Sequence, residues 1–178
     1  MGLLEGLFAG VLMITPVQAE VPETEPSAEC LAMNMYHEAR GQGIAGVLAV
    51  SFVVFNRVRD KRFPNTVCQV IQQGPTRESW KTRKVKNLSP TLRKYYPIRN
   101  RCQFSWWCDG RSDETKDTKL YARYLKIANG MIRNEFSLID ITDGATFYHA
   151  DYVKPAWAKT KYRTIEIGDH IFYRWEVK

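Results

Sequence analysis

Glu38 is the residue of this chain best suited to proton-transfer chemistry. It lies near the end of a predicted amphipathic helix, in the stretch from Met33 to Gly43, and shares one side of that helix with Leu31 and Met35. An ionised carboxylate beside core residues is costly unless it is paired, metal-bound or protonated. A protonated carboxyl group is what a general acid provides. A boundary glutamate paired with Arg40 is the structural alternative.

A second chemically promising stretch runs from Cys102 to Gly110 and contains Gln103, Ser105 and the pair Trp106-Trp107. Aromatic faces stack on sugar rings, and amide or hydroxyl groups bond the sugar's polar substituents, so this composition is typical of a carbohydrate cleft. The alternative is a disulfide-closed loop with both tryptophans in the core. Adjacent side chains of an extended segment point to opposite sides, which weakens that alternative.

Zinc chemistry is a competing interpretation. His37, His149 and His170 are possible ligands, and His37-Glu38 begins like the HExxH motif. Position 41 is Gly, however, so the paired helical ligand is missing. The cysteines contain no CxxC pair. We therefore expect no metal and no other cofactor.

Helices come first in the chain and strands later, which predicts an α+β fold. Ser27 is the predicted N-cap of the first helix, and Gly41 and Gly130 are predicted to end the first and third helices. The second helix is apolar nearly all round, which predicts a central position. A hairpin turn is predicted at Gly168-Asp169. The predicted helices span residues 27–39, 44–58 and 113–129, and the strands span 145–149, 164–167 and 170–173.

Composition divides the chain into further segments. Residues 1–19 hold a short apolar run followed by small side chains, which predicts a signal peptide cut after Ala19, or a short anchor. Residues 20–28 are a predicted linker and residues 29–178 the catalytic domain. Four cysteines agree with export into an oxidising compartment and can pair in three ways, among which a local Cys102–Cys108 bridge is favoured.

Residues 73–101 form a predicted basic insertion. It contains nine Lys and Arg against the single acid Glu78, with Trp80, Tyr95 and Tyr96 interleaved. The whole chain holds 26 Lys and Arg against 19 Asp and Glu, a net charge of +7. Such a balance favours an anionic partner, namely nucleic acid, acidic lipid or an acidic cell-wall polymer. A solvated surface insertion is the alternative.

Five short motifs occur in a fixed order along the chain. They are Glu38-Ala39-Arg40-Gly41, Asn56-Arg57-Val58, Phe63-Pro64, Gln103-Phe104-Ser105, and Gly144-Ala145 followed by Tyr148-His149. In this order they resemble the motifs of the spore-cortex-lytic type of cell-wall hydrolase, the SleB/CwlJ family, between Cys30 and Trp157. The resemblance implies a lysozyme-like helical catalytic domain with a small antiparallel β element, which cuts peptidoglycan.

The same resemblance implies that Glu38 is the catalytic acid. Gln103, Ser105, Tyr148 and His149 would then line the glycan cleft, and Trp106 joins them as a substrate-binding residue. The implied partner is the glycan strand of peptidoglycan, with an anionic wall polymer as a further partner of the basic insertion. No nucleic acid partner and no stable membrane span are expected. Such an enzyme would be exported and act in the periplasm or cell wall, whether of bacterial or phage origin.

A glycosidase acid must keep its proton near neutral pH, so we expect burial to raise the pKa of Glu38. Ordinary hydrolysis also needs a second carboxylate. Asp109 is the best candidate, with Asp143 behind it. If neither reaches the cleft, the substrate's own 6-hydroxyl can attack the anomeric carbon, so we predict a lytic transglycosylase and keep a muramidase open. The alternatives are an N-acetylmuramoyl-L-alanine amidase and a non-catalytic basic wall-binding module.

Overall fold

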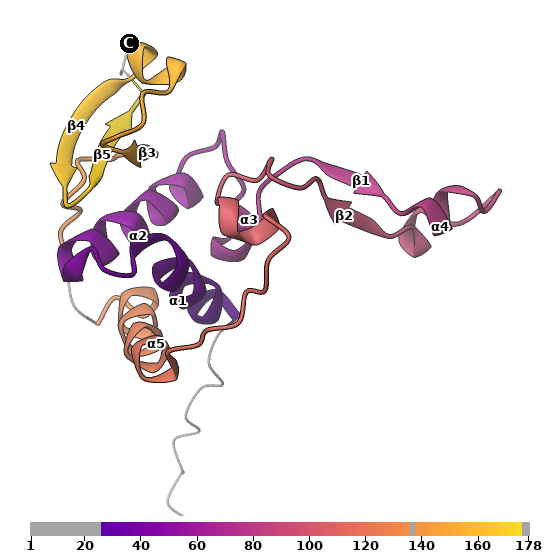
Figure 1. Cartoon of the computed structure of the whole chain (residues 1–178), viewed down its shortest axis with the longest axis horizontal. Helices are drawn as coiled ribbons and strands as arrows, with labels where there is room; N and C mark the ends of the chain where they lie inside the picture. The colour runs from indigo at the N-terminus through magenta and orange to yellow at the C-terminus, as the bar shows by residue number, and fades with distance from the viewer. Residues whose placement is uncertain (1–25, 136–137, 176–178) are drawn as a thin grey trace, which may run out of the picture.

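Helix α2 (Gly43–Arg59) lies at the centre of the fold in the computed structural model, which describes residues 26–135 and 138–175. One side of α2 contributes Val50 and Val54 to the main hydrophobic core among the helices. Another side packs Ala49 and Val53 against the C-terminal sheet. Figure 1 shows α2 between the other helices and that sheet. The prediction of a central second helix is therefore confirmed.

The body contains α1 (Pro26–Ala39), α3 (Val67–Ile71) and α5 (Thr118–Ile132) as further helices. Helices α1 and α3 pack against α2, whereas α5 packs mainly against α1. Leu31 and Met35 of α1 are fully buried, as the helical spacing predicted. A disulfide between Cys30 and Cys68 joins α1 to α3. Within the described residues, no helix has the length and apolar character that crossing a bilayer requires.

Helix α1 begins earlier than predicted. Its first residue is Pro26, so Ser27 lies inside the first turn and is not the N-cap, and the last residues of the expected linker are helical. The expected signal peptide at residues 1–19 lies outside the described residues. At the other end, Gly41 has a φ of 102° and follows the last helical residue closely, as predicted.

Helix α5 is shifted relative to the prediction of residues 113–129. Asp117 is its N-cap, because the Asp117 carboxylate accepts a hydrogen bond from the Leu120 N–H at 2.9 Å. Gly130 does not end the helix but is buried within it. The left-handed residue is Asn134, with a φ of 55°, and the Glu135 N–H bonds back to the Gly130 carbonyl at 2.9 Å. That geometry is a Schellman motif.

The C-terminal sheet is antiparallel with strand order β3-β5-β4. Its strands are β3 (Phe147–Ala150), β4 (Tyr162–Ile167) and β5 (His170–Arg174), and the short helix η3 (Ala156–Thr160) precedes β4. The predicted turn at Gly168-Asp169 joins β4 to β5. The Gln42 amide bonds both the carboxylate and the backbone N–H of Asp169, each at 2.9 Å, so this turn is fastened to the α1–α2 connection.

The basic insertion is an arm that projects from the body of the protein (Figure 1). We use "the arm" for residues 73–101. Its strands β1 (Thr76–Glu78) and β2 (Tyr95–Pro97) pair antiparallel, with α4 (Trp80–Arg83) and η1 (Pro90–Leu92) between them. None of its side chains is buried. The helices and the two small antiparallel sheets confirm the predicted α+β class.

Candidate active site

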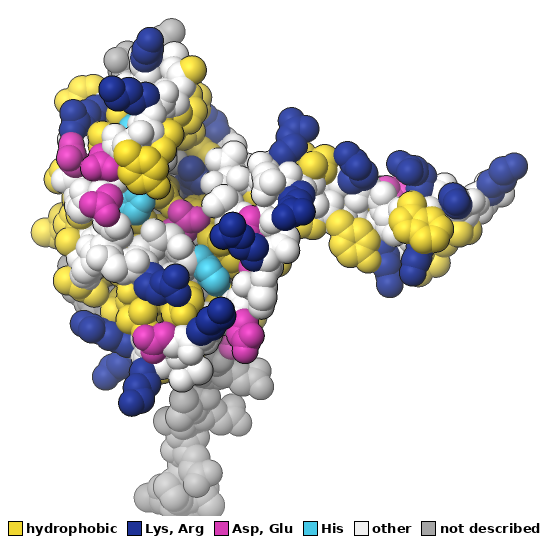
Figure 2. Space-filling model, viewed as in Figure 1, with side chains coloured by type: hydrophobic (Ala, Val, Ile, Leu, Met, Phe, Trp, Pro, Cys, Tyr) yellow, Lys and Arg dark blue, Asp and Glu magenta, His cyan; other side chains and the backbone are white. Residues whose placement is uncertain are grey.

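The predicted site residues meet in one groove of about 770 Å³. Helix α1 supplies Glu38 from its last turn, strand β3 supplies Tyr148 and His149, and the segment around η2 (Ser105–Cys108) supplies the rest. Figure 2 shows histidine and acidic side chains together across the middle of the body. Elements far apart in sequence thus bring together all six predicted residues: Glu38, Gln103, Ser105, Trp106, Tyr148 and His149.

The Glu38 carboxyl group is held by a tyrosine. Tyr148 donates its hydroxyl proton to Oε2 of Glu38 at an O···O distance of 2.7 Å. Burial raises the pKa of Glu38, while the hydrogen bond from Tyr148 and the nearby charge of Arg57 oppose this by favouring the ionised form. Burial prevails. Glu38 therefore has the elevated proton affinity that a general acid requires.

Tyr148 itself remains a hydrogen-bond donor. Burial raises the pKa of Tyr148 well above its ordinary value, and the neighbouring Glu38 raises it further. The ring packs among Phe104, His170 and Phe172, with centroid distances of 6.5, 5.0 and 5.6 Å. Since the ring is held on several sides, its hydroxyl is directed at the Glu38 carboxyl by packing as well as by the hydrogen bond.

Arg57 also lines the groove, although its sequence context predicted no role for it. Only 4% exposed, it donates from Nε to the Thr146 carbonyl at 2.7 Å. Its guanidinium carbon lies 5.2 Å from the ring centroid of Phe63 and 5.3 Å from that of Phe104. Burial lowers the pKa of Arg57 to about 10, so the group stays cationic at neutral pH. Its place in the Asn56-Arg57-Val58 motif was the only sequence signal.

Asn56 positions the strand that carries Tyr148. Its amide donates to the Asp140 carboxylate at 2.7 Å and to the Ala145 carbonyl at 3.1 Å. Asp140 also accepts hydrogen bonds from the backbone N–H groups of Thr142 and Gly144. Together with the bond from the neighbouring arginine to Thr146, these contacts fasten the start of β3 to the end of α2.

Trp106 belongs both to the core and to the groove. Its indole N–H donates to Oδ1 of Asn34 at 3.0 Å, and the side chain is 8% exposed. The indole stacks on the His37 ring with centroids 4.7 Å apart. The segment is not extended as expected but a 3-10 helix, so Trp107 also packs against the core and does not point away from it. The predicted Cys102–Cys108 bridge, which closes the loop, is confirmed.

Three histidines line the groove but make separate contacts. Nε2 of His37 lies 3.3 Å from the Asp113 carbonyl oxygen, and Nε2 of His149 lies 3.0 Å from the Tyr173 hydroxyl. Nδ1 of His170 is buried and has no hydrogen-bond partner among the residues that the structure describes. Within the part of the chain that the structure describes, no three His, Cys, Asp or Glu residues are grouped as metal ligands.

The two acids suggested as a second carboxylate differ in position. Asp109 lines the groove. Asp143 is not among the residues that line the groove. Its side chain is 65% exposed and its carboxylate pairs with Arg174 at 2.8 Å. Asp113 is a further groove acid, which no motif had indicated. Burial raises the pKa of Asp113, with His37 opposing and Asp109 reinforcing the shift.

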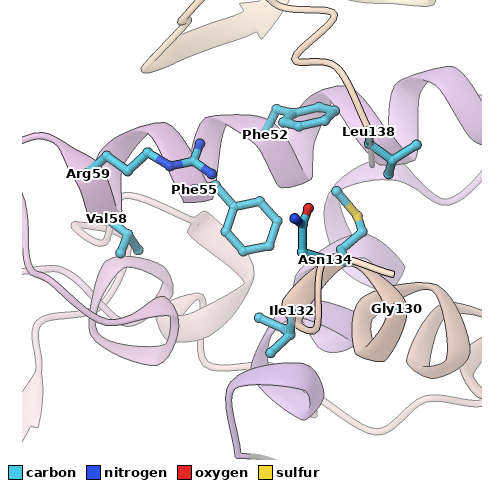
Figure 3. A pocket seen from close by; sticks show the side chains of 9 residues that line it. Phe52, Phe55, Val58, Arg59, Gly130, Ile132, Asn134 and Leu138 are labelled. Carbon is cyan, nitrogen blue, oxygen red and sulfur yellow. The ribbon is translucent and has the colours of Figure 1, made fainter. Parts of the chain in front are cut away.

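A separate pocket of about 360 Å³ lies between α2 and the end of α5 (Figure 3). Phe52, Phe55 and Val58 are among the mainly apolar side chains that line it, and Arg59 and Asn134 are polar. Among the described residues, none that lines this pocket carries a carboxylate or an imidazole. The groove around Glu38, unlike this pocket, is lined by side chains that can transfer protons.

Comparison with known proteins gives matches that agree with this fold. The catalytic domain of the Bacillus cereus SleB protein is 26% identical, with a TM-score of 0.51, and the match covers 83% of this chain and 89% of that one. The catalytic domain of the germination-specific lytic transglycosylase SleB from Bacillus anthracis is 23% identical, with a TM-score of 0.53, covering 89% and 100%. The latter identity supports similarity of fold alone.

No curated protein matches the chain. A family model described as Cell Wall Hydrolase matches residues 41–173, which is most of the chain. This match begins three residues after Glu38, so it leaves the role of Glu38 to the geometry of the groove. With a family match over this length and a fold similar to SleB catalytic domains, the chain belongs to the cell wall hydrolase family.

Proposed function

We propose that the chain cleaves the glycan backbone of peptidoglycan as a lytic transglycosylase, with Glu38 as acid and then base. The observation that carries the proposal is the Glu38 carboxyl group in the groove, with its pKa raised by burial and its position fixed by Tyr148. Membership of the cell wall hydrolase family supports the substrate. One protein of similar fold is described as a lytic transglycosylase.

The proposed reaction starts when Glu38 donates its proton to the glycosidic oxygen that leaves the muramyl ring. The bond between the anomeric carbon and that oxygen breaks. The ionised Glu38 then accepts the proton of the 6-hydroxyl on the same ring, while that oxygen bonds to the anomeric carbon. The product has a 1,6-anhydro ring, no water is consumed, and Glu38 regains its proton.

Two neighbours support the ionised stage of this cycle. The Tyr148 hydroxyl donates to the carboxylate, and Arg57 supplies a buried positive charge close by. Both contacts favour the carboxylate over the acid, so they stabilise the intermediate that follows proton donation. Because burial opposes them, Glu38 retains enough proton affinity to begin the next cycle.

Hydrolysis by a muramidase is the second candidate because Asp109 and Asp113 line the same groove. A hydrolytic glycosidase places its second carboxylate about 5 to 9.5 Å from the first. Replacement of either residue by Asn separates the two reactions. A transglycosylase that uses one acid keeps most of its activity in D109N and D113N, whereas a muramidase loses activity in one of them.

The products of purified peptidoglycan test the proposal directly. We expect glycan fragments that are one water lighter than those with reducing ends. Glu38→Gln should lower the rate about 10² to 10⁴-fold, the usual contribution of a general acid or base. Glu114→Gln, at an exposed acid of the body, is the matched control and should cut at the parent rate.

Other products contradict the proposal in recognisable ways. Reducing ends indicate a muramidase, and free stem peptides indicate an amidase. Binding without any release indicates a wall-binding module. We also infer that the enzyme works outside the cytoplasm, in the periplasm or cell wall, since its family acts on the wall and its four cysteines form two disulfides.

A further inference from the structure

The arm carries the chain's excess positive charge. Nine of the 26 Lys and Arg but one of the 19 Asp and Glu lie in it, so the remaining residues hold 17 basic against 18 acidic side chains. Its single acid, Glu78, is already paired with Arg93 at 2.7 Å. Figure 2 shows Lys and Arg along the whole arm, interspersed with hydrophobic side chains. An anionic partner is therefore attracted to the arm rather than to the body.

The arm contains a hollow of about 700 Å³ that combines cations with aromatic rings. Trp80 and Tyr96 line it and are 58% and 57% exposed. No core explains these rings, because none of the arm's side chains is buried. Such rings offer apolar faces to the C–H faces of sugars. The cations lining the same hollow are Arg77, Lys81, Arg83 and Arg99.

The hollow adjoins the catalytic groove. Arg99 lines the hollow and donates from Nε to the Asp109 carbonyl at 2.9 Å, and Asp109 lines the groove. The arm's base is also bonded to the η2 segment through the Asn100 N–H and the Cys108 carbonyl at 2.9 Å. A polymer strand that leaves the groove on this side therefore meets the arm first.

We propose that the arm binds peptidoglycan outside the catalytic groove. Trp80 and Tyr96 stack on sugar rings of the strand. Arg77, Lys81 and Arg83 pair with the carboxylates of its stem peptides. This attachment site rests on the proposed function, since it binds the same polymer as the groove. Because the hollow adjoins the groove, peptidoglycan is favoured as its partner over a membrane surface or a phosphate-containing wall polymer.

The test uses the full chain carrying Glu38→Gln, so that the wall stays intact, and sacculi stripped of phosphate-containing polymers. In a sedimentation assay, the arm variant R77Q/K81Q/R83Q should bind the sacculi with about tenfold lower affinity. The loss is moderate because each exposed charge contact contributes little binding free energy. The matched control K119Q/R123Q/K126Q removes equal charge from exposed positions of α5 and should bind like the parent. Trp80→Ala should weaken binding even at high salt, where charges are screened.

Equal affinities of the arm variant and the control would overturn the attachment site. So would a parent that binds only untreated sacculi, or only phosphatidylglycerol vesicles, since the partner would then be a phosphate-containing polymer or a membrane. Cleavage of short soluble glycan fragments, with Glu38 restored, separates this site from the proposed function. If the enzyme cuts the fragments but its binding to sacculi does not depend on the arm, the attachment site alone is refuted. If binding depends on the arm but no fragment is cut, the proposed transglycosylase activity alone is refuted.

Discussion

The proton affinity of Glu38 reflects opposing influences that single substitutions can separate. Tyr148→Phe removes a hydroxyl that favours the ionised form, so the pKa of Glu38 should rise further. Activity that needs the protonated acid is lost as pH rises past that pKa. The alkaline limb of kcat/KM on soluble glycan fragments should therefore move to higher pH. Tyr162→Phe, at a half-exposed residue of β4, is the control; a limb that moves to lower pH in Y148F would contradict this account.

Ionisation of the buried Glu38 should also lower the free energy of unfolding at neutral pH. Because its pKa is raised on folding, its favourable contribution is complete below about pH 4.3, the pKa of an unperturbed Glu, and is lost as pH rises through the folded value. Glu38→Gln should therefore raise the melting temperature at pH 7, by about 2 to 4 °C per kcal/mol gained, and change it little at pH 4. Calorimetry at both pH values, with Glu114→Gln as control, checks this. If the Glu38→Gln variant is no more stable than the parent at pH 7, burial of the ionised Glu38 carboxylate does not destabilise the fold.

Sequence reasoning identified Glu38 because helical spacing is local information. Leu31 and Met35 are buried as that spacing required, so the acid near them had to face the core or the groove. Arg57 was not recognisable in this way. Its surroundings are the rings of Phe63 and Phe104, which approach only in the folded chain. The acid Asp113 was missed for the same reason, since its burial depends on tertiary packing.

At the level of elements, the two disulfides should contribute unequally to stability. The Cys30–Cys68 bridge spans 38 residues and joins α1 to α3, whereas Cys102–Cys108 spans six. By the loop-entropy relation, their loss should lower the free energy of unfolding by about 4 and about 2 kcal/mol respectively. Urea denaturation of C30A/C68A and C102A/C108A measures both. Equal losses would show that strain or residual unfolded structure outweighs loop length here.

Element types were easier to predict than their limits. Helix α5 was expected to stop at Gly130 because glycine commonly ends helices, but Asn134 takes the left-handed position and the helix continues. Its start moved to Thr118 because Asp117 caps it. The segment with two tryptophans became a 3-10 helix, since packing of Trp106 on Asn34 and His37 decides its shape. The limits of a helix and the conformation of such a segment depend on tertiary contacts, which the local sequence does not reveal.

At the scale of the whole molecule, the arm should be removable without unfolding the body. No arm side chain is buried, and the Ile98 N–H bonds the Pro75 carbonyl at 2.9 Å, so the chain enters and leaves at neighbouring points. Replacing residues 76–97 with Gly-Gly should leave the melting temperature within a few degrees of the parent, about 1 kcal/mol or less in this size range. Thermal unfolding measures this. A loss of cooperative unfolding would mean that the arm is part of the folding unit.

The Cys30–Cys68 bridge has a consequence for the cell that makes this protein. Folded domains hold only about 5 to 15 kcal/mol in reserve, and a reducing cytosol withholds the bridge's share of it. A cell that makes this chain therefore obtains its full stability only where the two cysteines can oxidise. The redox state of the compartment thus sets how long the folded form persists.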